Sequence, residues 1–156
     1  MKISAKARYG VRALCALELL SGEENQGGSP VSLAQIAEKE NISKKYLGLI
    51  FHGLRKHGFV DAVRGLNGGY RLAKSANEIT VGSVVRALDG PLAPVGCLLP
   101  PGKNPASRCE RKATCASRKA WDRLQHHIEL ALDSITIQSL VEGEDPAPPG
   151  CDGYGI

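Results

Sequence analysis

The spacing of apolar residues divides the chain into helical segments. Residues 3 to about 21 and residues 81–88 each carry apolar side chains on one face, which predicts an amphipathic helix in both places. A third helix is predicted from about residue 116 to residue 134, and a short last helix from Thr136 through Leu140. The apolar stripe of the third helix consists of Trp121, Leu124, Ile128, Ala131, Leu132 and Ile135. This stripe exceeds what one small domain needs, so we expect a second copy of the chain to cover it.

Between the first two of these helices, the pattern predicts a pair of short helices. Ser32 and Gln35 form a Ser-x-x-Gln capping box, so a helix is expected to begin at Leu33, and Asn41 is suited to end it. Ser43 is expected to cap the next helix. The residues expected on the buried face of that helix are Tyr46, Leu47, Ile50 and Leu54. The order is therefore helix, turn, helix.

A glycine-rich hairpin is expected to follow these helices. The run 59–63 suits a β-strand and the run 70–73 suits its partner. The tip between them contains Gly65, Asn67, Gly68 and Gly69, which we expect to supply positive φ angles. The predicted fold class is mainly α: a winged helix-turn-helix DNA-binding domain with a small β-hairpin wing and a long C-terminal dimerisation helix.

The chemistry of these elements suits duplex DNA. A helix of this size fits the major groove, where short polar side chains near its start reach base edges. Lys44 and Lys45 are expected to meet phosphates, and Arg64 to enter a neighbouring minor groove. The predicted DNA-binding residues are Ser32, Ser43, Lys44, Lys45, Tyr46, His52, Arg55, Arg64 and Asn67. The alternative is a small helical domain with a solvated basic face.

The charge distribution agrees with a DNA partner. Residues 1–75 hold 12 Lys/Arg against 6 Asp/Glu, a net charge of +6, whereas residues 76–156 have a net charge of −2. No apolar run reaches the length of a membrane span, and Arg12 and Glu18 interrupt the N-terminal one, so we expect a cytoplasmic protein with no membrane partner. The sequence contains no nucleophile–base pair, P-loop or dinucleotide fingerprint, so we do not expect an enzyme.

Three cysteines lie in a proline-rich segment after the predicted helix at residues 81–88. Cys97, Cys109 and Cys115 are spaced Cys-x11-Cys-x5-Cys. Soft thiolates bind zinc, Cu(I) or an iron–sulfur cluster. Structural zinc sites usually contain ligand pairs 2–4 residues apart, and none occurs here, so the spacing favours a cluster; zinc and free or redox-active thiols stay as alternatives. Cys15 is expected to be a small buried hydrophobe, and Cys151 a free thiol.

These features predict four parts of the chain. Residues 1–90 form the winged helix-turn-helix DNA-binding domain, called the reader below, and residues 91–115 form a cysteine loop for cluster binding. Residues 116–141 form the dimerisation helix, and residues 142–156, rich in Gly, Pro and acidic residues, form a disordered tail.

These motifs resemble the bacterial Rrf2 family of winged-helix regulators, which includes the iron–sulfur regulator IscR, the nitric-oxide sensor NsrR and the cluster-free regulator CymR. The resemblance covers residues 1 to about 141 and rests on Met-Lys-Ile-Ser-Ala-Lys-Ala-Arg-Tyr-Gly at the start, Val-Ser-Leu-Ala-Gln-Ile-Ala and Arg-Gly-Leu-Asn-Gly-Gly-Tyr-Arg-Leu-Ala in the reader, and the three cysteines. It implies a homodimer on a partly palindromic DNA operator, with the long C-terminal helix crossing to the partner subunit. It also implies Cys97, Cys109 and Cys115 as ligands of an iron–sulfur cluster, 2Fe-2S or 4Fe-4S.

The chain departs from the family pattern at the expected fourth ligand. IscR-like members have His three residues after the third cysteine, where this chain has Arg118, and NsrR-like members use an Asp of the partner's first helix, where it has Arg8. The candidates for the fourth ligand are Glu110, His126, Cys151, an exogenous thiol or water. Many members also carry Glu where this chain has Gly48. We therefore expect this chain to prefer different DNA bases from those members.

The function implied is a DNA-binding transcriptional regulator, expected to be a repressor. An iron–sulfur cluster that senses redox state, nitric oxide or iron and cluster supply would control its binding to the operator. The alternative is a cluster-free winged-helix regulator controlled by a partner protein or by thiol oxidation.

Overall fold

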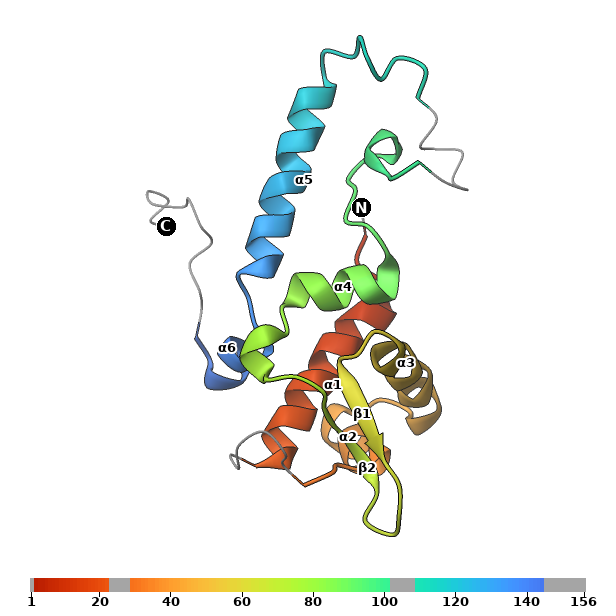
Figure 1. Ribbon diagram of the computed structural model, residues 1–156, viewed down its shortest axis with the longest axis vertical. Coiled ribbons are helices and arrows are strands. Elements are labelled where there is room, and N and C mark those ends of the chain that lie inside the picture. Colours follow the sequence, from red (N-terminus) through yellow and green to blue (C-terminus); the bar gives the residue numbers. More distant parts are fainter. Residues whose placement is uncertain (1, 23–28, 102–108, 145–156) are drawn as a thin grey trace.

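The structure is a computed structural model that describes residues 2–22, 29–101 and 109–144. In chain order, its elements are α1 (Ala5–Ser21), α2 (Leu33–Glu40), α3 (Lys44–Lys56), β1 (Val60–Val63), β2 (Gly69–Leu72), η1 (Ala76–Glu78), α4 (Val81–Asp89), η2 (Gly96–Leu98), α5 (Arg118–Asp133) and α6 (Ile137–Glu142). Figure 1 shows a helical body with one antiparallel hairpin and with α5 extending away from it. The order of helices and strands is the one predicted from the sequence.

Short polar side chains begin the helices of the reader. The Oγ of Ser4 accepts a hydrogen bond from the backbone N–H of Ala7 at 3.1 Å, so α1 begins at Ala5, two residues later than the apolar pattern suggested. Ser32 and Gln35 form the predicted capping box, and Asn41 ends α2 in the left-handed conformation with φ 52°. These caps are local, because each joins residues three or four positions apart, and a sequence pattern therefore finds them.

The core lies where α1, α2, α3 and the strands meet. Four side chains of α3 are fully buried in it, and they meet buried residues of α1 and α2. The largest fully buried side chains are Phe51, Leu14, Leu17, Ile36, Leu47, Ile50, Leu54, Ile79 and Ile137. Ile137 belongs to α6, so the chain returns to the core of the reader after it has left along α5. Figure 1 shows α6 beside α1.

The hairpin is extended by a third segment of backbone. β1 and β2 pair antiparallel from Val60 opposite Leu72 to Val63 opposite Gly69. Val31 forms a bridge to Tyr70 on the other side of β2, with N···O distances of 2.9 and 2.8 Å. The wing is thereby attached to the chain segment just before α2.

One prediction about the hairpin tip was wrong. Gly65 has a positive φ of 122°, but Asn67, Gly68 and Gly69 do not. Gly68 and Gly69 are required by close packing instead. A Cβ on Gly68 would lie 2.5 Å from the carbonyl oxygen of Val63, and a Cβ on Gly69 would lie 2.4 Å from that of Val31. Both obstacles are backbone atoms, so neither can move aside cheaply.

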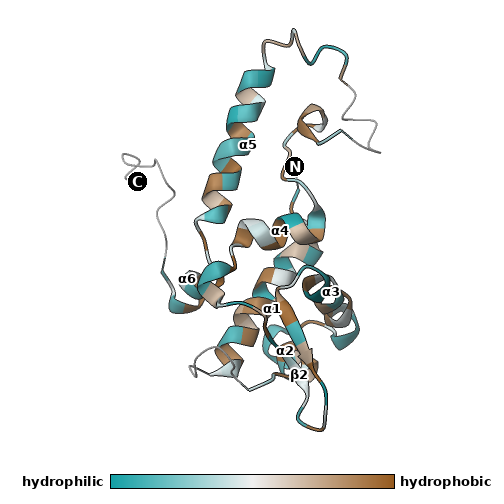
Figure 2. Ribbon diagram, in the orientation of Figure 1, coloured by the Kyte–Doolittle hydropathy of each residue, from teal (hydrophilic) through white to brown (hydrophobic). Residues whose placement is uncertain are grey.

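α5 is a long helix with no buried residue of its own. Its lower end is fixed by two backbone hydrogen bonds between the start of α4 and the chain that follows α5. Val81 N–H donates to Ile135 O at 2.8 Å, and Ile137 N–H donates to Ile79 O at 2.9 Å. Figure 2 shows hydrophobic residues recurring along α5, and Trp121 and Leu124 are 40% and 43% exposed. Among the residues that the structure describes, no helix is both long and apolar enough to cross a membrane.

Candidate nucleic-acid interface and cysteine segment

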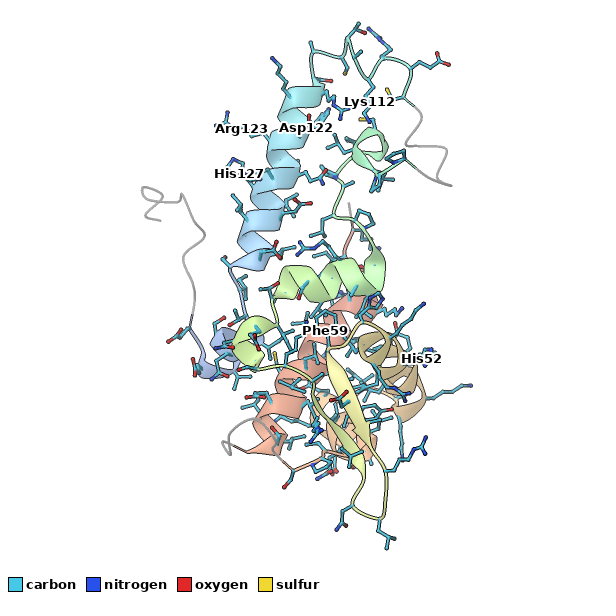
Figure 3. All side chains as sticks on the ribbon, in the orientation of Figure 1. His52, Phe59, Lys112, Asp122, Arg123 and His127 are labelled. Atoms are coloured by element: carbon cyan, nitrogen blue, oxygen red, sulfur yellow. The ribbon has the colours of Figure 1, made fainter. Side chains whose placement is uncertain are left out.

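The two sides of α3 differ as the sequence pattern predicts. Leu47, Ile50 and Leu54 are fully buried on the inner side, and Tyr46 is half-buried. The predicted contact residues Lys44, Lys45, His52 and Arg55 are exposed on the outer side. Figure 3 shows the His52 side chain on the outer side of α3, away from the core. The outer side of α3 is thus a basic, solvent-facing surface of the size that a DNA groove admits.

Three other predicted contact residues take part in local structure. The Oγ of Ser43 accepts a hydrogen bond from the N–H of Tyr46 at 3.3 Å and so caps α3. The hydroxyl of Ser32 donates to the side-chain carbonyl of Gln35 at 2.8 Å. The ring of Tyr46 packs edge-on against that of Tyr9, with the centroids 6.0 Å apart. These side chains position the starts of α2 and α3.

The wing carries the remaining predicted contacts. Arg64 and Asn67 are exposed at the hairpin tip, which extends beyond the helices in Figure 1. Leu66, between them, is fully exposed at 107%. The structure therefore presents two basic, exposed features, the outer side of α3 and the wing tip.

Sequence reasoning missed an ion pair that positions the reader helices. The guanidinium of Arg12 in α1 contacts Glu40 at the end of α2, with 2.8 Å from Nε to the carboxylate and 2.7 Å from Nη2 to the backbone oxygen. The same guanidinium lies 5.3 Å from the centroid of the Tyr9 ring. Arg12 therefore ties α1 to α2. No short motif signals this contact, because 28 positions separate the two residues.

Sequence reasoning also omitted Leu49 from the outer side of α3. This leucine is 63% exposed in the same helix as the buried Leu47 and Ile50. Its angular position could have revealed it, because Leu49 follows Lys45 by four residues and precedes His52 by three. A large apolar side chain therefore lies within the basic surface.

An apolar hollow opens between α1 and α4. It has a volume of about 310 Å³ and is lined by Ile3, Ala7, Arg8, Tyr9, Val11, Arg12, Val81 and Val85. The hollow and the outer surface of α5 are two apolar regions that the described part of the chain leaves uncovered.

The three cysteines of the predicted cluster site are partly exposed and form no disulfide. Cys97 lies in η2, and Cys109 and Cys115 lie in the segment that leads into α5. Figure 1 shows both segments at the same end of the molecule, near the start of α5. Within the described ranges, no three His, Cys, Asp or Glu side chains are grouped closely enough to hold a metal ion.

The chemistry of these thiols nevertheless suits metal binding. The Sγ of Cys115 lies 3.3 Å from the Oγ of Ser117, and this hydrogen bond lowers the pKa of the Cys115 thiol, with the positive charge of Arg111 acting in the same direction. A lowered pKa favours the thiolate, which is the form that binds metals. The donor set thus fits a thiolate-bound cluster by its chemistry, while the described residues show no assembled site.

Two candidates for the fourth ligand, Glu110 and His126, are exposed. Arg118, at the position where IscR-like members have His, begins α5 and pairs with Asp122 at 3.4 Å. Cys151 and the predicted tail beyond residue 144 lie outside the described residues.

Cys15 is a different kind of thiol. It packs against the core, as predicted, and burial raises the pKa of its thiol to about 11. A thiol with so high a pKa stays protonated at neutral pH and is a poor ligand.

The comparisons with known proteins agree with this architecture. Residues 3–143 match the Rrf2 family, described as iron-dependent transcriptional regulators. The regulator IscR of Pectobacterium carotovorum is 38% identical over 145 residues, which cover 93% of this chain and 82% of that protein. Among solved structures, the cysteine regulator CymR of B. subtilis has a TM-score of 0.70 and 34% identity over 93% of this chain and 99% of that one. IscR of T. potens has a TM-score of 0.68 and 32% identity, and the match covers 99% of this chain and 95% of that one.

Proposed function

The chain belongs to the Rrf2 family of transcriptional regulators, and we propose that it represses genes by binding a DNA operator as a homodimer under the control of an iron–sulfur cluster. Its relatives are DNA-binding regulators rather than enzymes. The site of action would be the cytoplasm, where the DNA lies. The observation that carries the DNA-binding role is the exposure of basic side chains on the outer side of α3 and at the wing tip.

Each element of the reader would have a distinct role on DNA. α3 would enter the major groove, with Lys44 and Lys45 on phosphates and His52 and Arg55 further along the same exposed side. Ser32, Ser43 and Tyr46 would hold the starts of α2 and α3 against the sugar–phosphate backbone of the DNA. Arg64 and Asn67 at the wing tip would reach the adjacent minor groove, where a guanidinium is attracted by the negative potential of A·T-rich DNA.

A second copy of the chain would cover α5. The helix has apolar residues along its length but buries none of them within its own subunit. Pairing of two such helices would place two readers at a fixed spacing, which matches a palindromic operator.

Cys97, Cys109 and Cys115 would hold the cluster. A bound cluster would react with nitric oxide or oxygen and would lose iron when iron is scarce. The thiolate form of Cys115 is favoured by Ser117 and Arg111, and basic residues near the thiols would offset the negative charge of the ligands. Cys115 lies three residues before the first residue of α5. Ordering this segment would fix the start of α5, and the far end of α5 is attached to α4 of the reader.

Anaerobic purification tests the cluster. We expect an absorbance band in the region of about 400–450 nm, together with bound iron and sulfide. Replacement of Cys97, Cys109 or Cys115 by Ala should each remove the band, whereas Cys15→Ala is the matched control and should retain it. Loss of colour in Cys151→Ala would identify the tail as the source of the fourth ligand. Full colour and iron in all three loop variants would contradict cluster binding.

A cluster-free regulator is the second candidate. The fold similarity to CymR favours it, as does the dispersed arrangement of the three thiols in the described residues. In that case operator binding should respond to thiol oxidation or to a partner protein and should be the same with and without iron. Footprinting of genomic DNA with iron-loaded and iron-free protein distinguishes the two candidates and also tests whether the chain binds specific sites at all.

A further inference from the structure

The outer side of α3 contains an exposed leucine among basic residues. Leu49 is 63% exposed, whereas the buried side chains of α3 are 0% exposed, so Leu49 takes no part in the core. Lys45, Leu49, His52 and Lys56 follow one another at intervals of four, three and four residues and therefore share one face of the helix. The packing of the core therefore does not account for an apolar side chain at the centre of this face.

The residue beside Leu49 is also unexplained by the fold. Gly48 lies inside α3, where glycine costs roughly 1 kcal/mol of helix stability relative to alanine. A Cβ at this position would meet no atom within 4 Å. Gly53, in the same helix, differs because a Cβ there would lie 3.0 Å from a methyl group of Leu88. Packing therefore explains Gly53 but not Gly48.

From these observations we propose that Leu49 reads the 5-methyl group of thymine in the major groove. This inference rests on the proposed function, since it requires α3 to enter that groove. The thymine methyl is the one apolar group that base pairs present there, and an aliphatic side chain is its natural contact. The missing side chain at Gly48 leaves room for the helix to approach the base edges beside Leu49.

The surrounding charge favours DNA over a protein as the occupant. Lys45 and Lys56 lie one helical turn on either side of the Leu49–His52 pair, and Lys44 and Arg55 are exposed nearby. Cations that flank an apolar centre match a groove in which phosphates border the methyl groups. Leu49 would thus supply sequence preference, while its neighbours supply affinity.

The test removes the methyl group from the DNA without changing its hydrogen bonds. The purified full-length protein first selects preferred sites from a random duplex library. One selected site is then made with thymine and, in parallel, with uracil, which pairs with adenine in the same way but lacks the methyl. We expect affinity to fall by about fourfold per half-site in the uracil duplex, the value for one buried methyl-sized group. Replacement of one thymine at a time by uracil would identify the thymine that Leu49 contacts.

Two protein variants test whether Leu49 causes the difference in affinity between the thymine and uracil duplexes. Leu49→Ala should bind the thymine site more weakly, by about the same factor, and should no longer distinguish thymine from uracil. Leu19→Ala removes a leucine of similar exposure, 52%, from α1 and should retain the full distinction. Both positions are exposed, so an unchanged melting temperature is expected and should be measured.

Two results would overturn this inference alone. One is equal affinity of the native protein for thymine and uracil forms of a preferred site. The other is a Leu49→Ala variant that keeps the distinction or binds the thymine site with native affinity, as expected if a protein covers Leu49. Failure to recover any preferred site would overturn the proposed function, and the inference with it.

Discussion

Arg86 of α4 and Asp133, the last residue of α5, form a bidentate ion pair. The Nη2 of Arg86 lies 2.7 Å from Oδ1 of Asp133, and Nη1 lies 3.1 Å from Oδ2. The hydroxyl of Thr80 donates to the same carboxylate at 3.3 Å. The pair is partly exposed, so its stabilisation is modest, on the order of 1 kcal/mol or less. Its importance is geometric, because it fixes the direction of α5 relative to the reader.

Gly82→Ala should release α5 without unfolding the reader. A Cβ at Gly82 would lie 2.1 Å from Oδ1 of Asp133, so the carboxylate must move away from Arg86. Alanine also favours the helix by up to about 1 kcal/mol, which offsets the lost ion pair. We expect a nearly unchanged melting temperature, but faster hydrogen exchange at the amides of Val81 and Ile137, which join the two segments. Unchanged exchange would show that the backbone hydrogen bonds alone hold α5.

Gly69→Ala should detach the wing from the segment before α2. The added Cβ would lie 2.4 Å from the carbonyl oxygen and 2.5 Å from the carbonyl carbon of Val31. Since backbone cannot move aside cheaply, we expect a loss of about 1–3 kcal/mol in the free energy of unfolding. Gly48→Ala is the matched control, which should instead stabilise by about 0.5–1 kcal/mol because its Cβ meets nothing. Urea titrations give both values, and equal stabilities would contradict the packing argument.

Lys44→Ala and Lys45→Ala should weaken binding to every duplex. Each lost phosphate contact should reduce the log–log dependence of affinity on salt by about 0.9. Lys119→Ala, an exposed lysine of α5, is the control and should leave the slope unchanged. The slope is measured by fluorescence anisotropy over a series of salt concentrations. A native slope in both reader variants would place these lysines away from DNA.

Arg64→Ala should lose affinity mainly on A·T-rich flanking sequences. Arg64 is exposed near the wing tip, and a guanidinium gains most in the narrow minor groove of such DNA. Titration of A·T-flanked and G·C-flanked versions of one selected site measures the difference. An equal loss on both versions would exclude the minor-groove role.

Leu124→Asp together with Ile128→Asp should break the proposed dimer. The two residues lie on one face of α5, and burial of two unpaired carboxylates in an interface formed by this face would be strongly unfavourable. Light scattering should then show monomers or aggregates. Lys119→Asp with Arg123→Asp adds two carboxylates on the opposite, exposed face of α5 and should leave the dimer intact. A stable dimer from the first variant would place the interface elsewhere.

Cys15 should make stability fall at alkaline pH. Burial raises the pKa of its thiol from 9.0 to about 11, so the folded state binds this proton more tightly than the unfolded state. The corresponding stability is fully present below pH 9 and is lost as the pH rises toward 11. Other groups titrate in the same window, so urea midpoints of the native protein and Cys15→Ala must be compared. The native protein should lose more stability than the variant between these pH values, and parallel curves would contradict the burial effect.

Interactions between residues close together in the sequence are sufficient to predict the helices and strands of this protein. The capping box of Ser32 and Gln35, the left-handed Asn41 and the buried side of α3 each depend on residues within a few positions of one another. The caps form within a single turn, and the helical period of the apolar residues marks the side of α3 that other elements cover, so spacing alone predicts both. The basic outer side of α3 follows from the same periodicity.

Tertiary structure decided the contacts that join distant segments. Gly69 is required because Val31 approaches it from another part of the chain, and a hairpin pattern alone suggested the wrong reason, a positive φ. The pairs Arg12–Glu40 and Arg86–Asp133 join residues 28 and 47 positions apart, and many other charged pairs in the sequence could have formed instead. Only the folded chain brings such partners together, because their distances depend on every element between them.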